Sequence, residues 1–317
     1  MKILANDGIA PIGKENLEKA GYEVITETVS QEDLINSINE NNYVGILVRS
    51  ATTVRENLID ACPGLKLIGR GGVGMDNIDV EYARNKGLSV INTPAASSQS
   101  VAEQVMAHLF SASRSIYDSN RQMPVSGASD FKILKKKYGK GVELRGKNIG
   151  IIGFGRIGQS LAKYALGCGM NVIAFDPFMD EATINVQVAD QTVSVNIKTT
   201  TLDELLAKAN YISMHVPMPA DGNALIGSSE FAKMKDGVII ANAARGGVID
   251  ETALIANLAT GKVAHAALDV FTNEPTPRED LLKHANISLT PHTGAATGEA
   301  QDRIGEELAE QIIEILG

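Results

Sequence analysis

Short runs of apolar and β-branched residues alternate with amphipathic stretches along most of the chain. Near the amino terminus these runs predict strands at Lys2–Leu4, Tyr22–Ile25, Val44–Val48, Lys66–Ile68 and Leu88–Ile91. Stretches with helical periodicity lie between them, for example at Gln31–Glu40 and Val54–Ala61. Strands that alternate with helices indicate βαβ units, in which the strands run parallel.

A second series of strands and helices begins at Asn148. Its predicted strands are the segments NIGIIG, NVIAF, YISM, GVIIA, AHAAL and ISLT, each followed by a turn or a helical pattern. Six such steps are enough for a complete doubly wound domain. The pattern therefore predicts an α/β protein with two domains, and we see no internal repeat and no low-complexity segment.

Three further segments have patterns of their own. Ser98–Tyr117 predicts one long helix, and the polar, lysine-rich segment FKILKKKYGKG after it predicts a loop. The last segment, Gly298–Leu316, predicts an amphipathic helix. Its apolar face carries Ile304, Leu308, Ile312 and Ile315. The pattern leaves open which of the two domains this last helix packs against.

Composition narrows the class of protein. The chain has 317 residues, of which 44% are apolar and 21% charged, as is usual for a soluble globular protein. Its net charge of -9 and its lack of Trp argue against nucleic acid or an anionic membrane as a partner. Cys62 and Cys168 lack a CxxC spacing, which indicates a reducing compartment and no metal site. With no secretory signal and no apolar span, we expect a cytoplasmic protein with a small-molecule substrate.

The strand NIGIIG leads into the motif Gly153-x-Gly155-x-x-Gly158, and a helix is predicted from Arg156 to about Gly167. In such a motif the first glycine permits a tight turn and the second admits a pyrophosphate. The third lets the helix pack closely on the strand. The helix N-terminus supplies free N–H groups for the phosphates. Glycine turns also occur in α/β cores without a ligand, but here the strand, the glycines and the helix agree.

The second strand of this unit ends at Asp176, where a carboxylate can bind both hydroxyls of the adenosine ribose. A carboxylate repels the 2′-phosphate of NADP, and the next residue, Pro177, cannot neutralise it. The sequence therefore favours NAD over NADP as the cofactor.

Three polar residues follow later strands of the second series. Arg245 follows GVIIA in the run NAARGGVIDE, Glu274 follows AHAAL in DVFTNEP, and His292 follows ISLT in LTPHTGAAT. Doubly wound sheets bind their ligands outside the carboxyl ends of the strands. Each residue also has a plain structural alternative, namely a helix-capping arginine, an exposed loop glutamate and a polar loop histidine.

These residue types match a hydride transfer between an alcohol and a ketone. An arginine can pair with a substrate carboxylate, and a histidine can exchange the accompanying proton near neutral pH. A glutamate paired with His292 would orient the ring and stabilise its protonated form. Asp269 could bind the nicotinamide carboxamide, and we expect His215 in SMHVP to line the cofactor site.

The order of GxGxxG, ARGG, DVFxxEP and PHxGA resembles the D-isomer-specific 2-hydroxyacid dehydrogenase family over nearly the whole chain. The resemblance implies that Arg245, Glu274 and His292 are the catalytic residues. Together with the glycine motif it implies a cofactor-binding set, namely Val73, Gly153, Gly155, Arg156, Ile157, Gly158, Asp176, His215, Val216, Pro217, Ala243, Ala244, Arg245, Asp269, His292, Gly294 and Ala295.

Three stretches, at residues 48–54, 69–79 and 294–309, resemble the members of the family that act on D-3-phosphoglycerate. In those enzymes the first two stretches line the substrate site. The resemblance thus implies a substrate-binding set of Arg49, Ser50, Arg70, Gly72, Val73, Arg245 and His292. It implies NAD-dependent oxidation of D-3-phosphoglycerate to 3-phosphohydroxypyruvate, the first step of serine biosynthesis. Without the resemblance, Arg49 and Arg70 would be read as surface or helix-capping residues.

The same resemblance implies a layout. We expect a substrate domain of residues 1–97 plus 291–317 and an NAD-binding domain of residues 98–290, both Rossmann or flavodoxin-like, with the active site in the cleft between them. We also expect a homodimer built by the segment after Ser98. The lysines at 132, 135, 136 and 137 would then reach the partner's active site and help bind the phosphate.

The sequence leaves two alternative functions open. After the segment NTP at 92–94, Ala96 and Ser97 stand where the family usually has Gly-Asn, near the expected substrate. A glyoxylate or hydroxypyruvate reductase, acting on unphosphorylated acids, is therefore the alternative activity. The alternative outside the enzymes is an NAD-sensing binding protein without catalytic activity, like the corepressors that share the fold. No serine-sensing domain follows before Gly317, so feedback through such a domain is not expected.

Overall fold

The computed structural model describes residues 1–219 and 221–317. The chain forms two compact units, Met1–Ser100 with Ala295–Gly317 and Val101–Gly294. The chain leaves the first unit three residues later than the expected boundary at 97, and it returns four residues later than the expected boundary at 290. Within the described residues no helix combines the length and the apolar character needed to cross a bilayer.

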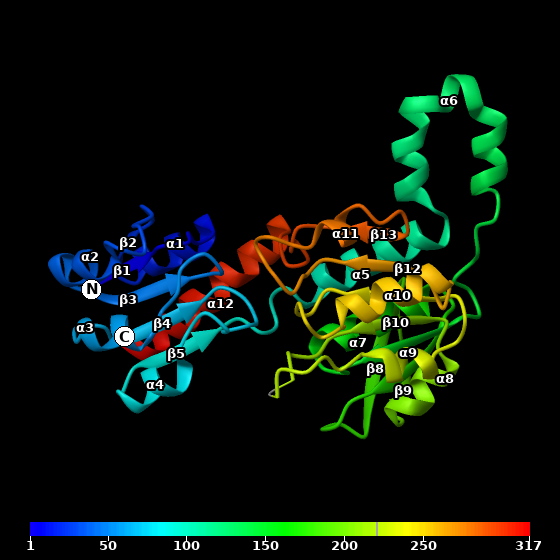
Figure 1. The fold of residues 1–317 in the computed structure, drawn as a ribbon. Helices are drawn as coiled ribbons and strands as arrows, with labels where there is room; N and C mark the ends of the chain where they lie inside the picture. Colours follow the sequence, from blue (N-terminus) through cyan, green and yellow to red (C-terminus); the bar gives the residue numbers. More distant parts are fainter. Residues whose placement is uncertain (220) are drawn as a thin grey trace. The chain divides into compact units, whose positions relative to one another are not determined.

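The first unit is built around one parallel sheet of five strands in the order β2-β1-β3-β4-β5. These strands are β1 (Lys2–Ala5), β2 (Glu23–Ile25), β3 (Tyr43–Val48), β4 (Leu67–Arg70) and β5 (Ser89–Asn92). Apolar residues of α2 (Leu34–Asn41), α3 (Glu56–Ala61) and α4 (Val80–Asn85) form a core on one face of the sheet. Those of α1 (Pro11–Lys19) and α12 (Gly298–Leu316) cover the other face (Figure 1).

The carboxy-terminal helix α12 packs against α1 and so belongs to the first unit. The two helices touch at a pair of glycines, because a Cβ atom on Gly13 would lie 2.5 Å from the carbonyl oxygen of Gly305. Ile304, Leu308 and Ile312 are buried as predicted. Ile315, the last residue of the predicted apolar face, lies in the final turn of the helix and is 40% exposed.

The second unit contains a six-stranded parallel sheet in the order β13-β12-β11-β10-β6-β7. The strands are β6 (Asn148–Ile152), β7 (Asn171–Phe175), β10 (Tyr211–Met214), β11 (Val238–Asn242), β12 (Val263–Leu268) and β13 (Ile287–Leu289). All six were predicted from the sequence. The strand order reverses between β6 and β10, and a doubly wound sheet binds its ligand at such a point.

Helices cover both faces of this second sheet. One core includes residues of α8 (Leu202–Lys208), α9 (Ser228–Lys233), α10 (Glu251–Thr260) and α11 (Glu279–Leu282). The other includes residues of α5 (Ser98–Ser113) and α7 (Arg156–Gly167). The fold is thus α/β with two doubly wound parallel sheets, as the strand and helix pattern predicted.

A β-hairpin after β7 was not predicted. The strands β8 (Glu181–Val188) and β9 (Gln191–Lys198) pair antiparallel over their whole length. Alternate side chains point to one face, where Ile184 and Ile197 are buried beside α7. The opposite face is polar and includes a hydrogen bond from Ser194 to Asn185. This alternation of apolar and polar residues is typical of a half-buried hairpin.

The segment after α5 differs from both predictions made for it. Instead of one helix ending at Tyr117, α5 ends at Ser113 and the left-handed Ser115 (φ 51°) separates it from α6 (Ile116–Tyr138). The predicted loop is helical as far as Tyr138, because its Lys, Ile and Leu residues favour a helix. No glycine or proline marks the break at Ser115, so the sequence pattern gave no sign of it.

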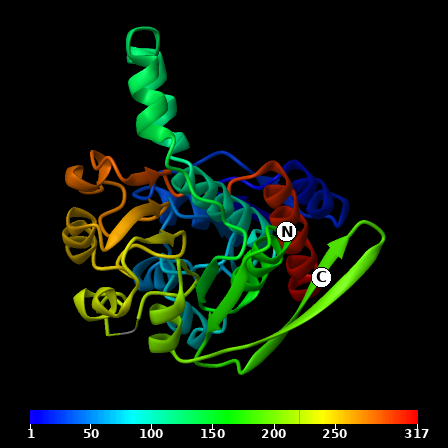
Figure 2. The same ribbon diagram turned by 90° about the vertical axis from the view of Figure 1, so that its right-hand side faces the viewer.

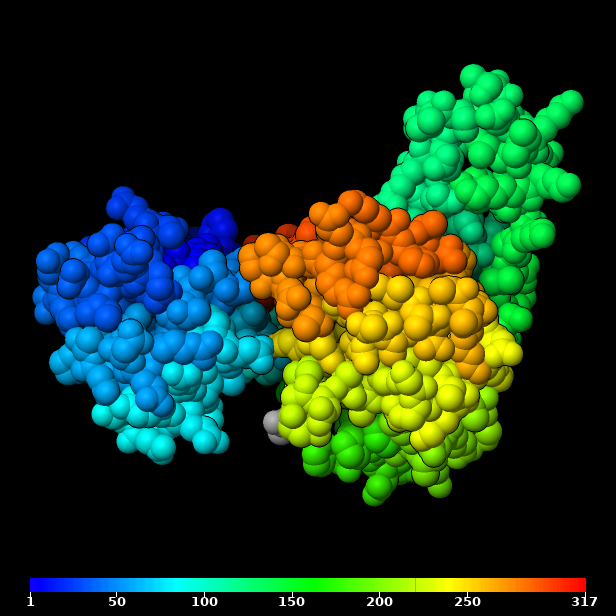
Figure 3. Space-filling model, in the orientation of Figure 1, coloured from blue at the N-terminus to red at the C-terminus, as the bar shows by residue number. Residues whose placement is uncertain are grey.

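The helix α6 is a bent arm. Its backbone departs from helical geometry at Asp130. Lys137 Nζ lies 2.8 Å from Asp118 Oδ2, although a straight helix would separate residues 19 positions apart by about 28 Å. The two halves of the arm therefore fold back on each other. Figures 1, 2 and 3 show the arm standing away from the rest of the second unit.

Candidate active site

The glycine motif forms the tight turn between β6 and α7. Gly153 has a φ of 90°, and a Cβ atom there would lie 2.4 Å from the carbonyl oxygen of His215. A Cβ atom on Gly158 would lie 2.2 Å from the carbonyl oxygen of Gly153. Around Gly155, in contrast, there is open space. Arg156 and Ile157 begin α7, whose first N–H groups face this space, so the turn fits a pyrophosphate.

Asp176 stands directly after β7 and is linked to the glycine turn. Its Oδ2 accepts the N–H of Phe154 at 2.8 Å, and its Oδ1 accepts the N–H of Phe178 at 2.9 Å. A carboxylate has about four acceptor positions, so each oxygen keeps one for a ribose hydroxyl. Pro177 and Phe178, which follow, are exposed and carry no positive charge that would favour a 2′-phosphate.

His215 follows β10 on the other side of the glycine turn. Its Nε2 lies 2.9 Å from Ser213 Oγ, while its Nδ1 is buried with no hydrogen-bond partner in the described structure. Burial lowers the pKa of His215 to about 3, so the ring is neutral. Val216 is half-buried and Pro217 is exposed. A neutral ring with an unpaired nitrogen at this turn fits a site that a bound dinucleotide completes.

Arg245 lies in a run that is held by Asn242 at the end of β11. Asn242 Oδ1 accepts the N–H of Ala244 at 3.0 Å, and Asn242 Nδ2 donates to the carbonyl oxygen of Arg245 at 2.8 Å. A Cβ atom on Gly246 would lie 1.9 Å from the carbonyl oxygen of Phe271. Gly246, the residue after Arg245, therefore packs directly against the backbone of the loop that carries Glu274.

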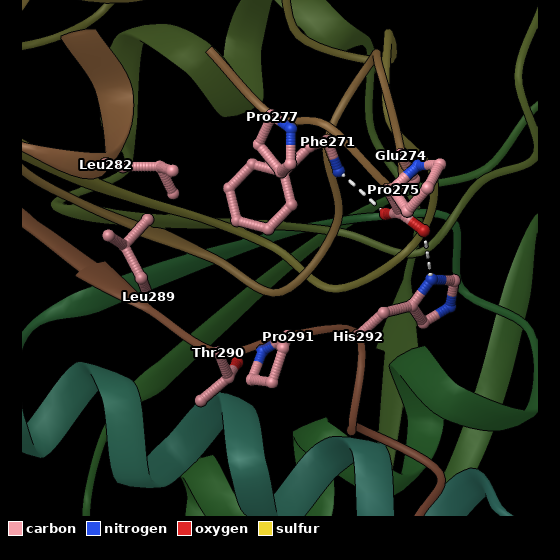
Figure 4. Close-up of a pocket in the computed structure, with 9 residues that line it drawn as sticks. All are labelled: Phe271, Glu274, Pro275, Pro277, Leu282, Leu289, Thr290, Pro291 and His292. Atoms are coloured by element: carbon pink, nitrogen blue, oxygen red, sulfur yellow. Dashed lines mark hydrogen bonds and ion pairs between the residues drawn. The ribbon is translucent and has the colours of Figure 1, made fainter. Parts of the chain in front are cut away.

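His292 and Glu274 form a pair. His292 Nδ1 lies 2.7 Å from Glu274 Oε2, and Glu274 Oε1 accepts the N–H of Phe271 at 2.9 Å (Figure 4). The His292 side chain is 46% exposed. Because Nδ1 faces the carboxylate, Nε2 is the ring nitrogen that can exchange a proton with a substrate.

The backbone of His292 is unusual. Its φ is 53°, a left-handed conformation that costs energy in a residue other than glycine. Such strain persists only where the surrounding structure holds it, and it is common at functional sites. Here the N–H of His292 donates to the carbonyl oxygen of Asp269 at 2.8 Å.

A pocket of about 390 Å³ opens beside the pair. Figure 4 shows Glu274 and His292 at one end of this pocket, with apolar side chains around the rest of it. Its lining consists of Phe271, Glu274, Pro275, Pro277, Leu282, Leu289, Thr290, Pro291 and His292. The proton-exchanging histidine therefore borders a space that is mostly apolar.

The buried carboxylate of Asp269 holds the turn that carries His292. Its Oδ1 accepts hydrogen bonds from Gln104 (2.9 Å), from the Thr290 hydroxyl (2.6 Å) and from the N–H of Thr293 (2.8 Å). Its Oδ2 accepts the N–H of Gly294 at 2.9 Å. One acceptor position on Oδ2 remains for another donor.

Sequence reasoning missed Gln104 and His108 in this network. His108 is buried, with Nδ1 2.8 Å from Ser288 Oγ and Nε2 3.1 Å from Thr290 Oγ1, and burial lowers its pKa. Gln104 and His108 are four positions apart and so lie on one face of α5. Two polar residues on the apolar face of this helix were the signal in the sequence.

The first unit holds a second group of candidate residues around a glycine turn after β4. Arg70 ends β4, and a Cβ atom on Gly72 (φ 145°) would lie 1.6 Å from Arg70 Nη1. A Cβ atom on Gly71 would lie 3.7 Å from Cγ of Arg49, which follows β3. Gly72 therefore leaves room for the Arg70 guanidinium that a larger residue would displace, and the stem of Arg49 passes within van der Waals distance of Gly71.

Three other residues of the predicted sets, Ser50, Val73 and Ala295, also belong to the first unit. Ser50 is exposed next to Arg49, and Val73 is 37% exposed beside Gly72. Burial lowers the pKa of Arg49, and the charge of Asp7 opposes that shift. A guanidinium stays protonated in proteins, so Arg49 is a cation here. Ala295 begins the last segment of the first unit.

The predicted lysines lie on the arm α6. Lys137 is held by Asp118 and by the hydroxyl of Tyr138, and its hydrogen bond to Asp118 is the main reason that its pKa rises to about 12. Lys132, Lys135 and Lys136 are exposed on the same arm. Lys137 is therefore already engaged within its own chain.

Comparison with known proteins identifies the family. Residues 106–294 match the family model described as "D-isomer specific 2-hydroxyacid dehydrogenase, NAD binding domain". The D-3-phosphoglycerate dehydrogenase of Archaeoglobus fulgidus is 41% identical over 99% of this chain, which spans 57% of that relative's length. The hydroxypyruvate reductase of Thermotoga maritima is 43% identical over 97% of this chain and 96% of its own length.

A solved structure has the same fold. The structure of NAD⁺-bound 3-phosphoglycerate dehydrogenase from Entamoeba histolytica is 29% identical, with a TM-score of 0.78, over all of this chain and 95% of that one. The family match covers more than half of the chain and contains the glycine turn described above. The chain therefore belongs to the D-isomer specific 2-hydroxyacid dehydrogenases and carries their NAD-binding domain.

Proposed function

We propose that this protein oxidises D-3-phosphoglycerate to 3-phosphohydroxypyruvate with NAD, the first step of serine biosynthesis. The observation that carries this proposal is the His292–Glu274 pair, 2.7 Å apart, in the unit that has the NAD-binding fold. Gly246, next to Arg245, packs against the loop of Glu274, so an acid/base and a carboxylate-binding cation would belong to one unit.

In the proposed reaction His292 Nε2 removes the proton from the 2-hydroxyl group as the carbon–oxygen double bond forms. Glu274 stabilises the protonated ring through Nδ1. Arg245 binds the substrate carboxylate and polarises the oxygen that becomes the carbonyl. When bound, NAD accepts the hydride from C2, so that one hydride and one proton leave the alcohol together. In the reduction His292 gives its proton back to the carbonyl oxygen.

The residues that would hold NAD follow from the turn geometry. Gly153, Gly155 and the start of α7 with Arg156 and Ile157 would bind the pyrophosphate. Asp176 would bind the ribose hydroxyls and favour NAD over NADP. The remaining members of the proposed set are Val73, Gly158, His215, Val216, Pro217, Ala243, Ala244, Arg245, Asp269, His292, Gly294 and Ala295.

The phosphate specificity rests on the first unit. The Arg70 guanidinium lies against Gly72 and the stem of Arg49 lies beside Gly71, and two guanidinium groups would suit a doubly charged phosphate better than a plain acid. The names of several relatives support the same substrate, among them the archaeal enzyme at 41% identity. We further propose that Ser50 and the backbone at Gly72 and Val73 complete the substrate site.

A hydroxypyruvate reductase is the second candidate. The Thermotoga maritima relative of that name matches this chain at 43% identity and is of nearly equal length. This candidate needs the same residues of the second unit but has no use for a phosphate site. Arg49 and Arg70 therefore distinguish the two functions.

We also propose that α6 joins two copies of the chain into a homodimer. Within the described residues the arm carries five large exposed apolar residues, Ile116 (50%), Met123 (44%), Val125 (81%), Phe131 (56%) and Ile133 (67%). Apolar groups on a projecting arm are usually covered by a partner. Lys132, Lys135 and Lys136 would then be free to assist the partner's phosphate site, whereas Lys137 is tied to Asp118.

Turnover of a substrate panel tests the function. We expect NADH absorbance to change with D-3-phosphoglycerate and 3-phosphohydroxypyruvate more efficiently than with glyoxylate or hydroxypyruvate. Replacing Arg49 and Arg70 together by Ala should abolish only the activity on phosphorylated acids. Gly72→Ala, which displaces Arg70, should raise KM for those acids, whereas Gly64→Ala in open space should not. Equal losses on both classes of acid would favour the reductase.

A further inference from the structure

We propose that Asp7 is a positioning residue that holds the Arg49 loop in the shape that binds an anionic substrate. The inference rests on the proposed function of Arg49 as a phosphate ligand. Asp7 follows β1, and neither the sequence motifs nor the proposed reaction involves it.

The carboxylate of Asp7 makes three hydrogen bonds to the loop after β3. Its Oδ2 accepts the N–H of Arg49 at 2.6 Å and the N–H of Thr52 at 3.1 Å. Its Oδ1 accepts the hydroxyl of Thr52 at 2.6 Å. Hydrogen bonds to a charged acceptor are shorter and stronger than those between neutral groups. One side chain thus closes the turn from Arg49 to Thr52.

Two asparagines hold the same turn from other sides. Asn77, in the loop after β4, donates through Nδ2 to the carbonyl oxygens of Arg49 (2.8 Å) and Thr52 (2.6 Å). Asn6 donates through Nδ2 to the hydroxyl of Thr52 at 2.8 Å. Asn6 and Thr52 are both buried. The backbone of Arg49 is therefore bonded at its N–H by Asp7 and at its carbonyl by Asn77.

The hydrogen bonds around Asp7 and Arg49 lie at the position in the sheet where ligands usually bind. The strands β1 and β3 are neighbours at the point where the strand order of the first sheet reverses. Doubly wound sheets bind ligands outside the carboxyl ends of the strands at such a point. Arg49 directly follows β3, Asp7 is the second residue after β1, and Asn77 approaches from the loop after β4.

The charge of Asp7 indicates a positioning role. A carboxylate next to an anion site repels the anion, so electrostatics alone would disfavour it there. Its two oxygens are instead directed at the N–H groups and the hydroxyl of the turn. It also favours the charged form of Arg49 against the effect of burial on the pKa of that residue.

The test compares Asp7→Ala and Asp7→Asn with the wild-type enzyme. We expect Asp7→Ala to raise KM for the phosphorylated acid about tenfold and to leave kcat within about twofold, because the chemistry lies in the other unit. Asp7→Asn keeps one acceptor oxygen, so its KM should lie between those of the wild type and Asp7→Ala. The matched control is Asp60→Ala, which removes another hydrogen-bonded carboxylate of the same unit, one bound to Tyr82 and Lys86.

Binding of NADH, followed by its fluorescence, should be the same in all these variants. The inference would be overturned if KM were unchanged in Asp7→Ala. It would also be overturned if kcat fell by the same factor as KM rose. If Asp7→Ala fails to fold, Asp7→Asn alone tests the inference. A KM of Asp7→Asn equal to that of the wild type then overturns the inference.

The two proposals can fail separately. If the wild type prefers a plain acid, the proposed substrate is wrong, and the role of Asp7 is then judged by the KM of that preferred acid. Calorimetric titration with 3-phosphoglycerate gives a readout that needs no turnover. Binding that is equally tight in the wild type and Asp7→Ala, or absent from the wild type for every acid tested, overturns the inference.

Discussion

His292 Nδ1 lies 2.7 Å from Glu274 Oε2, and the two residues are 18 positions apart in the chain. The other oxygen of the carboxylate accepts the N–H of Phe271, so the backbone sets the direction in which Glu274 points. The ring is held at its backbone as well, because the N–H of His292 donates to Asp269. The pair is thus oriented from both sides, with Nε2 left for the substrate.

Replacing Glu274 by Gln should lower kcat. The uncharged amide no longer balances the charge of the ring after His292 has taken the proton from the substrate, so the loss should be at least about tenfold. The measurement is kcat in both directions, together with NADH binding, which should not change. Glu279→Gln, at the start of α11 and paired with Lys283, should keep the wild-type rate; equal rates in the two variants would contradict the role of the pair.

Replacing His292 by Ala should remove most of the turnover. Loss of a general acid/base typically costs about 10²–10⁴ in rate, so kcat should fall by that factor. NADH binding, measured by fluorescence titration, should survive. His284→Ala is the matched control, because that ring accepts the backbone N–H of Asn286 and has no part in the proposed reaction. If NADH binding is lost together with activity, His292 has a structural role instead.

Replacing Asp176 by Ala should weaken the selectivity for NAD over NADP. The variant loses the carboxylate that would bind the ribose and repel a 2′-phosphate. It also loses the bonds to Phe154 and Phe178, so the KM for NAD should rise at least about tenfold. Steady-state kinetics with both cofactors give the ratio, and Asp180→Ala, further along the same exposed loop, serves as control. An unchanged ratio means that another group sets the selectivity.

Replacing Phe131 and Ile133 together by Ser should weaken the proposed dimer. Both side chains are more than half exposed on the arm, so the change should cost little stability in the separate chain. Sedimentation velocity at micromolar concentration should then show monomers where the wild type shows dimers. Val188→Ser, at an exposed apolar position on the β-hairpin, should leave the dimer intact. A monomeric wild type would exclude the proposal at once.

Much of the fold could be predicted because its signals are local. Each parallel strand is a short run rich in apolar residues, and most are buried on both faces of the sheet, so β6, β7 and β10 to β13 were recognised one by one. The glycine motif was recognised by its fixed spacing between a strand and a helix, although the close neighbour of Gly153 is His215 from another strand. Arg245, Glu274 and His292 were singled out because each follows a recognisable strand, and the family resemblance implied their roles.

The hairpin β8–β9 and the arm α6 were missed because the residue pattern of each segment also fits another kind of structure. The alternation in Glu181–Lys198 is that of a strand pair, but it lies where a crossover helix is usual in a doubly wound sheet. In α6 the lysines suggested a solvated loop, whereas the contact of Lys137 with Asp118 depends on the bend at Asp130. A contact between two halves of one segment cannot be read from the composition of either half.

The sequence by itself determined the two parallel sheets, the dinucleotide turn and the residue types available for chemistry. These depend on periodicity and on spacing along one stretch of chain. Only the tertiary structure decided that Asp7 closes the loop of Arg49, that Gln104 bonds to Asp269, and that the carbonyl oxygen of His215 lies against Gly153. These relationships join residues from different strands and helices, and a hydrogen bond or a steric contact exists only once folding has brought its two groups within a few ångströms.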